Sequence, residues 1–285
     1  MSKEQVAKNN ILHRLRRRIT WILQGRSIKD KMRLILFTIL WWLYSVKLPL
    51  VSQYLHQIAD TVVKGATVYC KGSYYYLIDA ATVHYFLGES HEPWMWNYLK
   101  SLKDNDVFVD VGAHIGLYSI YVARISKRGK VIAIEPHPEN FQFLLLNIKL
   151  NKLRNVIALN LAAWKENVEL PLYIADSSGG HTLKPTTARK RVVSIRGRRL
   201  DDIIGELGIS KVSFVKIDVE GAEVEVLEGL RNTLRIHRPK LMVEVWKDNA
   251  GAVRRFLEDL NYSIQKVSES ISKDFCYIYA TSSLK

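Results

Sequence analysis

From residue 106 onward the chain alternates short apolar runs with amphipathic stretches. The apolar runs have the length of buried strands, and we expect strands at 107–111, 131–135, 156–159, 212–217, 241–246, 262–267 and 275–280. The stretches between them repeat apolar residues with the helical period, and we expect helices at 116–126, 138–151, 222–230 and 250–260. Alternating strands and helices of this kind predict an α/β fold, with a mostly parallel central sheet and helices on both of its faces.

Three further segments complete the expected organisation. Residues 66–88 are rich in Tyr, Val and Thr and read as short strands or a hairpin, and 89–102 reads as a helix. Residues 168–195 predict an excursion of short strands and loop. We therefore expect a helical extension over residues 1–60 and a main domain over 61–285.

The extension combines an amphipathic pattern with basic residues. Apolar residues recur at helical spacing between several arginines, at Ile11, Leu12, Leu15, Ile19, Ile22 and Leu23. An uncharged run from Leu34 to Val46 follows, too short for the about 20 residues that span a bilayer. Two interpretations stay open for residues 1–50: an anchor lying in the interface of a membrane, or helices packed on the main domain.

Composition narrows the class of protein. The 285 residues are 48% hydrophobic, enough for a sizeable core, and the net charge is +14. Residues 1–33 hold ten Lys/Arg and two Asp/Glu, so the excess concentrates there and suits an anionic surface, nucleic acid or an acidic substrate. Only Cys70 and Cys276 are present, which favours a reducing, cytoplasmic compartment and offers no zinc site.

The end of the first expected strand carries a cofactor-site pattern. Gly112 permits a tight turn and Gly116 opens the following helix, with the spacing G-x-x-x-G rather than the dinucleotide G-x-G-x-x-G. This spacing suits a ligand that has a carboxylate and a ribose but no pyrophosphate. Backbone N–H groups of the turn would donate hydrogen bonds to that carboxylate. Glu135, at the end of the next strand, is placed to accept hydrogen bonds from ribose hydroxyls.

Three sequence blocks resemble one family. VDVGAHIGLYSIYVAR, VIAIEPHPENFQFLLLNIKLN and VKIDVEGAEVEVLEGL, in this order, resemble the FkbM family of S-adenosylmethionine-dependent methyltransferases, over roughly residues 88–265. The resemblance implies a Rossmann-like class I methyltransferase fold and S-adenosylmethionine as cofactor. It places a set of residues at this cofactor: Asp110, Gly112, Ala113, His114 and Gly116 around the methionine part, Glu135 at the ribose and Asn160 near the adenine. The family usually has Asn where this chain has His114.

Asp218 and Glu220 are the leading candidates for catalysis. They follow the expected strand 212–217, and two residues apart in an extended stretch they face the same side. Neighbouring carboxylates repel, which raises a pKa toward the range of a general base that accepts a hydroxyl proton. His181, after Gly179 and Gly180 in an expected mobile loop, is a secondary candidate. We expect no metal ligand cluster, although Asp218 and Glu220 have the chemistry to hold Mg²⁺.

The acceptor is the least determined feature. The family resemblance favours O-methylation of a sugar or glycan hydroxyl at the cytoplasmic face of a membrane. Methylation of RNA is the alternative, supported by the charge and by seven basic residues within 184–199, but the sequence has no RNA-binding module signature. A third alternative is a cofactor-binding module without catalysis.

Overall fold

The chain folds into two compact units, Met1–His91 and Glu92–Lys285. The computed structural model describes residues 16–45, 52–88, 92–186, 191–269 and 274–283. Each unit has its own packed interior, and the second contains all the elements of the predicted α/β pattern.

One large sheet forms the centre of the second unit. Its described strands are β3 (Val107–Val111), β4 (Lys130–Ile134), β5 (Val156–Leu159), β9 (Phe214–Ile217), β10 (Lys240–Trp246), β11 (Tyr262–Glu269) and β12 (Phe275–Ser282). Their order across the sheet is β11-β12-β10-β9-β3-β4-β5, and β12 runs antiparallel to both of its neighbours. The pairs from β10 to β5 are parallel, which confirms the predicted mostly parallel sheet.

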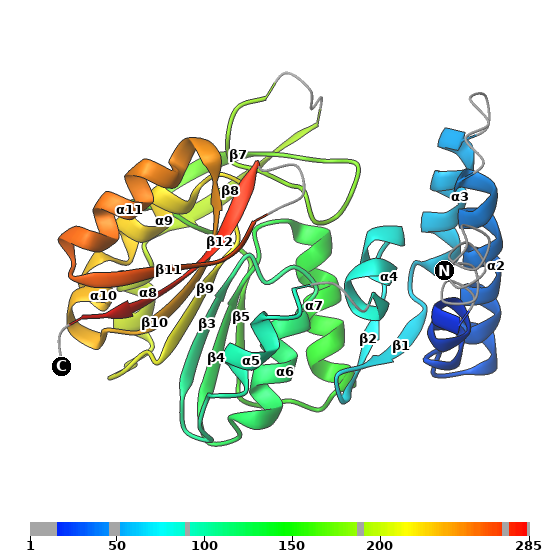
Figure 1. Cartoon of the computed structure of the whole chain (residues 1–285), viewed down its shortest axis with the longest axis horizontal. Helices are drawn as coiled ribbons and strands as arrows, with labels where there is room; N and C mark the ends of the chain where they lie inside the picture. The colour runs from blue at the N-terminus through cyan, green and yellow to red at the C-terminus, as the bar shows by residue number, and fades with distance from the viewer. Residues whose placement is uncertain (1–15, 46–51, 89–91, 187–190, 270–273, 284–285) are drawn as a thin grey trace, which may run out of the picture. The chain divides into compact units, whose positions relative to one another are not determined.

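Helices cover both faces of this sheet (Figure 1). They are α5 (Met95–Leu99), α6 (Leu117–Ile125), α7 (Pro138–Leu150), α8 (Leu200–Glu206), α9 (Glu223–Gly229), α10 (Arg231–His237) and α11 (Ala250–Asp259). Side chains alternate between the faces: Val109 and Val111 join the core under α8–α11, whereas Ala133 packs with Leu144 of α7 on the other face. This two-sided burial explains why the central strands are almost continuously apolar.

The strand order reverses between β3 and β9. From β3 the chain moves outward through β4 and β5, and β9 and β10 then lie on its other side. In open α/β sheets ligands bind outside the carboxyl ends of the strands at such a reversal. The fold therefore directs attention to the residues that follow β3, β4, β9 and β10.

The predicted excursion forms a small separate sheet. Its described strands are β6 (Ala162–Ala163), β7 (Val168–Tyr173) and β8 (Val192–Arg198), in the order β6-β8-β7. Helices α8 and α10 were not predicted, because each has only seven residues and carries too few apolar repeats to show a helical period.

The first unit is built from helices and a hairpin. Residues 16–23 are helical, and the further elements are α2 (Ile28–Ser45), α3 (Ser52–Val63), the hairpin β1 (Thr67–Cys70) and β2 (Ser73–Tyr76), and α4 (Ala80–Leu87). The hairpin was predicted, but residues 80–87 form a helix with an Asp79 capping box where strands were expected. Cys70 and Cys276 are both free thiols.

The boundary between the units lies later than the expected one near residue 60. The hairpin packs with the preceding helices, because the Asp30 carboxylate accepts a hydrogen bond from the Thr67 amide (3.1 Å) and Gly25 pairs with Val68. The Trp21 indole N–H also donates to the carbonyl of Leu87 (2.6 Å). These contacts tie residues 66–88 to the extension rather than to the α/β domain.

The described helices include none long and apolar enough to cross a membrane. The helical segment 16–23 agrees with the predicted amphipathic helix, whose first residues Ile11, Leu12 and Leu15 lie outside the described residues. Within the first unit α2 packs against α3, so part of the predicted apolar run is buried there at Leu34, Phe37 and Leu40.

Asp30 should be a main determinant of the first unit's stability. Its carboxylate accepts hydrogen bonds from the backbone N–H and hydroxyl of Ser27 and from the Thr67 amide, and its side chain is buried. Asp30→Ala leaves buried donors without a partner, so we expect a loss of about 1–3 kcal/mol in the free energy of unfolding by urea denaturation. The exposed Asp259→Ala should change it by less than about 0.5 kcal/mol, and equal effects would contradict this role.

Candidate functional site at the carboxyl edge of the sheet

The turn after β3 requires glycine at position 112. Gly112 has φ +77°, and a Cβ atom there would lie 1.8 Å from the carbonyl oxygen of Asp218, which follows β9. A side chain would therefore separate the two strand ends that border the reversal of strand order. Gly112 is what lets these two backbones approach so closely.

Gly116 has a different reason for being glycine than the sequence suggested. Its φ is +94°, and a Cβ atom would lie 2.7 Å from Cδ1 of Leu144, so the position lets α6 and α7 pack together. The N–H groups of Gly112 and Ala113 both donate to the carbonyl of Ile134. These two amides are thus committed within the protein, and the expected carboxylate contact through them would need other donors of the turn.

Glu135 is a buried carboxylate held at the end of β4. One oxygen accepts from the His114 amide (2.8 Å), and the other from the His137 amide (2.9 Å) and the Asn140 side chain (3.3 Å). Burial raises the pKa of Glu135 to about 7, although these donors oppose the shift. A carboxylate has about four acceptor positions, so one remains for a ligand hydroxyl. Glu135 therefore links the turn after β3 to the turn after β4.

Asn160 lies next to Glu135 in the structure. Its side-chain amide donates to the carbonyls of Glu135 (2.9 Å) and Pro136 (3.0 Å), which ties the ends of β4 and β5 together. The amide N–H groups are thereby used, and the amide oxygen is the atom with acceptor capacity toward a ligand. The adenine role of Asn160 stays a prediction.

The segment between β7 and β8 contacts the turn after β3 and the turn after β4. The Ser178 hydroxyl lies 2.8 Å from Nε2 of His114. The backbone carbonyl of Ser178 accepts a hydrogen bond from the side-chain amide of Asn140 (2.9 Å). The ring of His181 packs against that of His137 at a tilt of 42°, with 4.0 Å between ring centroids, and the Thr182 hydroxyl donates to the carbonyl of Glu220 (2.6 Å). The segment expected to be a mobile loop is therefore held against the site, and His181 lies beside the turn after β4.

Asp218, at the end of β9, shares one cation with Asp110. The Lys216 ammonium lies 3.1 Å from the Asp218 carboxylate and 3.7 Å from that of Asp110, which is fully buried. Burial by itself would lower the pKa of Lys216, but the surrounding carboxylates outweigh it and raise that pKa. Burial also raises the pKa of Asp110, whose Oδ2 accepts from Ser119 (2.6 Å) and whose Oδ1 has no hydrogen-bond partner.

A second group of acids lies beside Asp218. Glu92, from the start of the second unit, accepts hydrogen bonds from the hydroxyls of Tyr118 and Tyr277, and Tyr277 also contacts Glu244 at the end region of β10. The Tyr277 hydroxyl has one proton and can donate it to only one of the two carboxyl groups. The other hydrogen bond therefore requires a proton on Glu92 or Glu244. Burial, with the charge of Asp218, raises the pKa of Glu244 well above its usual range. We infer that Glu244 is neutral and donates to Tyr277, which donates to Glu92.

The acids offer oxygen atoms at the spacing of a cation site. One carboxylate oxygen each from Glu92, Asp218 and Glu244 lies within 4.8 Å of the others. Hard divalent cations such as Mg²⁺ prefer carboxylate oxygens, so a cation bound here would have to displace the proton assigned to Glu244. Of the pair named from the sequence, Asp218 belongs to this group, while the backbone of Glu220, with φ +54°, makes the turn that follows it.

Glu92 and its two tyrosine partners were not predicted as site residues. Glu92 and Tyr277 are 185 residues apart and belong to no motif that links them, and Tyr118 looked like an ordinary helix residue. Lys216 carried a signal, because a charged residue inside the buried strand β9 needs a partner. Glu244, in the strand expected at 241–246, also lies in the cluster.

The basic segment 184–199 is less available for ligands than the sequence suggested. Arg189 and Lys190 lie outside the described residues. Three of the others pair with carboxylates: Lys184 with Glu225, Arg198 with Glu206, and Arg199 with Asp201. These pairs reduce the positive charge that the segment could offer to phosphate groups.

Comparison with known proteins identifies this architecture. Residues 110–264 match the FkbM methyltransferase domain. The matched region is more than half of the chain and includes the turns after β3 and β4 and Asp218 after β9. The chain belongs to the FkbM methyltransferase family. It is an S-adenosylmethionine-dependent methyltransferase, as the three sequence blocks predicted.

Individual relatives are distant. The chain is 30% identical over 201 residues to the methyltransferase sdnD of Sordaria araneosa, covering 59% of this chain and 78% of that protein. It is 29% identical over 138 residues to the hexuronic acid methyltransferase AglP of Haloferax volcanii, covering 48% and 55%. A crystal structure of an FkbM methyltransferase from Methylobacillus flagellatus aligns with a TM-score of 0.48 and 17% identity, covering 95% of this chain and 60% of that one.

Cofactor affinity should depend on the protonation of Glu135. If Glu135 binds the ribose as expected, the hydroxyls donate more strongly to its carboxylate than to its carboxylic acid, so binding favours loss of the proton whose pKa is raised to about 7. We expect the affinity for S-adenosylmethionine to increase by up to about tenfold from about pH 6 to about pH 8 in calorimetry. Glu135→Gln should bind more weakly with little pH dependence, and the same slope in both proteins would exclude Glu135 as its origin.

Proposed function

We propose that this FkbM methyltransferase transfers the methyl group of S-adenosylmethionine to a hydroxyl of a sugar or glycan. The observation that carries the proposal is the position of Asp218, a partly exposed carboxylate at the reversal of strand order, 3.1 Å from a buried ammonium. The relative named as a hexuronic acid methyltransferase supports a sugar as the acceptor class.

The turns after β3 and β4 fit this cofactor. Oδ1 of Asp110 has no hydrogen-bond partner but already lies 3.7 Å from the Lys216 ammonium, so the fit rests on Glu135 and Asn160, which have acceptor capacity for a ribose hydroxyl and an adenine amino group. The surplus of carboxylates over Lys216 favours a ligand with positive charge. When bound, the cofactor supplies a methyl group activated by a positively charged sulfur.

Asp218 is the proposed general base. Its role is to accept the proton of the acceptor hydroxyl as the new bond to carbon forms, and Lys216 holds the carboxylate in place. Glu244 is neutral in our assignment and cannot take this proton. Glu220 and His181 remain alternatives, although the ring of His181 is engaged with His137.

Replacing Asp218 should separate chemistry from cofactor binding. Asp218→Asn keeps the size of the side chain but cannot accept a proton, so we expect turnover to fall about 10²–10⁴-fold while affinity for S-adenosylmethionine changes little. Transfer of labelled methyl groups to lipid-linked glycans and to RNA, followed by mass spectrometry, measures this and identifies the acceptor. A fully active variant would remove Asp218 as base, and methylated RNA would replace the sugar assignment.

We also propose that the first unit binds the surface of an anionic membrane. Large apolar side chains of α2 are exposed at helical spacing, on a stripe formed by Ile28, Met32, Ile35, Ile39 and Trp42. Exposed cations of the same unit, Arg16, Arg26 and Lys29, complement anionic lipid headgroups. This combination of an apolar stripe with basic residues is typical of helices that lie in the interface.

Removing part of the stripe should release the protein from vesicles. Ile35→Ser, Ile39→Ser and Trp42→Ser together remove apolar area that would insert between lipids, so we expect flotation with phosphatidylserine-containing vesicles to weaken by at least about tenfold. The matched control carries the same change at three exposed apolar residues of the second unit, Leu145, Leu146 and Ile236. Equal loss in both variants would contradict membrane binding through α2.

A further inference from the structure

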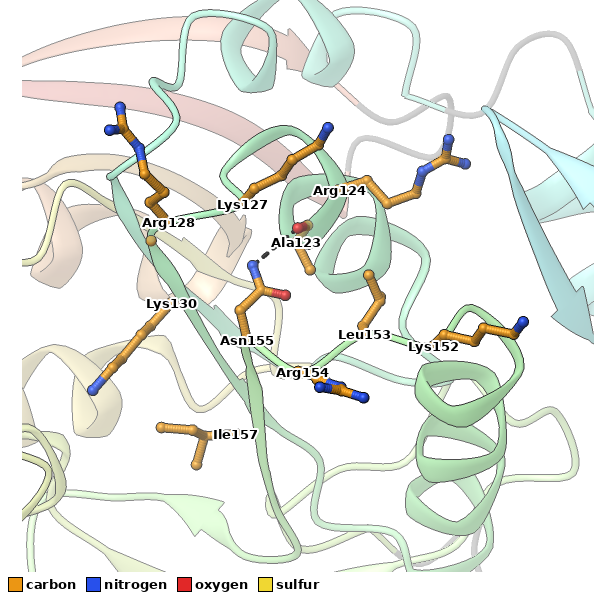
Figure 2. A pocket seen from close by; sticks show the side chains of 11 residues that line it. Ala123, Arg124, Lys127, Arg128, Lys130, Lys152, Leu153, Arg154, Asn155 and Ile157 are labelled. Carbon is orange, nitrogen blue, oxygen red and sulfur yellow. Dashed lines mark hydrogen bonds between the residues drawn. The ribbon is translucent and has the colours of Figure 1, made fainter.

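A pocket of about 880 Å³ lies at the amino ends of β4 and β5. It is bordered by the link from α6 to β4 and by the link from α7 to β5 (Figure 2). Because the strands are parallel, this is the edge of the sheet opposite to Glu135 and Asp218. The length of β4, five residues, puts the pocket about 15 Å from the methyl-transfer edge.

The floor of the pocket has a defined shape. The side-chain amide of Asn155 donates to the carbonyls of Ala123 (2.9 Å) and Ser126 (2.8 Å), the first of which is drawn in Figure 2. The Ser126 hydroxyl in turn donates to the carbonyl of Asp106 (2.8 Å). These bonds fix the ends of α6 and β5 against each other, so the pocket is a built feature and not a gap between loose loops.

Six exposed cations line the pocket: Arg124, Lys127, Arg128, Lys130, Lys152 and Arg154. Stabilisation of helix ends explains some of this charge, because α6 and α7 both end here and each helix end is equivalent to roughly −0.5 charge. Arg128 is paired with Asp104 at 2.5 Å, and Arg124 makes another interaction. The other four cations still leave about three positive charges that the helix ends do not offset.

The composition of the lining indicates the class of ligand. Among the described residues that line the pocket, none is acidic and none is aromatic. Recognition of nucleic-acid bases by stacking needs aromatic side chains, so the pocket offers charge recognition only. Arg and Lys bind phosphate oxygens through charge-assisted hydrogen bonds, and cations on both sides of the pocket suit several phosphates on one compact ligand.

We propose that this pocket binds a multiply phosphorylated ligand, at a site separate from that of methyl transfer. The recognised chemistry is a cluster of phosphate groups, carried by a soluble molecule or by phosphorylated lipid headgroups. Lys130 begins β4 and Arg154 precedes β5, so a ligand held by both would contact both segments that border the pocket.

Inorganic tripolyphosphate is the probe for a soluble ligand. We expect it to bind the 285-residue chain in calorimetry with an affinity that falls as salt increases. The pocket variant, Lys130→Glu with Arg154→Glu, should weaken binding by at least about tenfold. The matched control is Lys211→Glu with Lys240→Glu, two exposed lysines near the amino ends of β9 and β10, which changes the net charge equally. The control should change affinity by less than about twofold.

Vesicles of phosphatidylcholine with phosphatidic acid test the lipid source. Retention that tripolyphosphate reverses, and that falls in the pocket variant but not in the control, assigns the headgroup as ligand; tripolyphosphate binding without such retention assigns a soluble ligand. Equal weakening in both variants, no binding by the wild type, or retention of single-stranded RNA that tripolyphosphate does not displace would each overturn the proposal. Both variants should melt cooperatively near the wild-type temperature, which excludes misfolding as the cause.

Discussion

The structure depends most on how it compensates negative charge at the carboxyl edge of its sheet. Asp110, Asp218 and Glu244 are brought together because β3, β9 and β10 are neighbours, and Glu92 joins them from the start of the second unit. Burying several carboxylates is costly unless each is paired, protonated or hydrogen-bonded. Lys216, two tyrosine hydroxyls and a proton on Glu244 supply this compensation, and a positively charged cofactor would add to it.

Most of the α/β domain could be predicted from local pattern alone. Strands such as 107–111 and 156–159 were predicted with their observed bounds, because each is a short, mainly apolar run bounded by polar residues or glycine. The helix at 80–87 was missed because it continues the Tyr- and Val-rich segment 66–88, which was read as strands, while the capping box at Asp79 decides in favour of a helix. The boundary between units was misplaced because it depends on contacts such as Asp30 with Thr67, which no local pattern reveals.

The site was predictable only where its residues follow strands in sequence. Gly112, Glu135 and Asp218 sit at strand ends, so a prediction of the strands places them at one edge. Glu92 and Tyr277 come from segments far apart in the chain, and their contact exists only in the folded domain. The roles predicted for the glycine turn were also incomplete. Gly116 lets α6 and α7 pack together, and the amides of Gly112 and Ala113 donate to the carbonyl of Ile134.

The two edges of the sheet carry opposite charge, and this changes what the net charge of +14 means. Within the second unit the acids gather after the carboxyl ends of the strands, whereas exposed cations such as Lys130 and Arg154 border the amino ends. A basic protein is readily taken for one that methylates nucleic acid, because phosphates are attracted to its surface. Here the pocket cations lie at the edge opposite to the proposed base, and their charge is therefore evidence about a second ligand and not about the methyl acceptor.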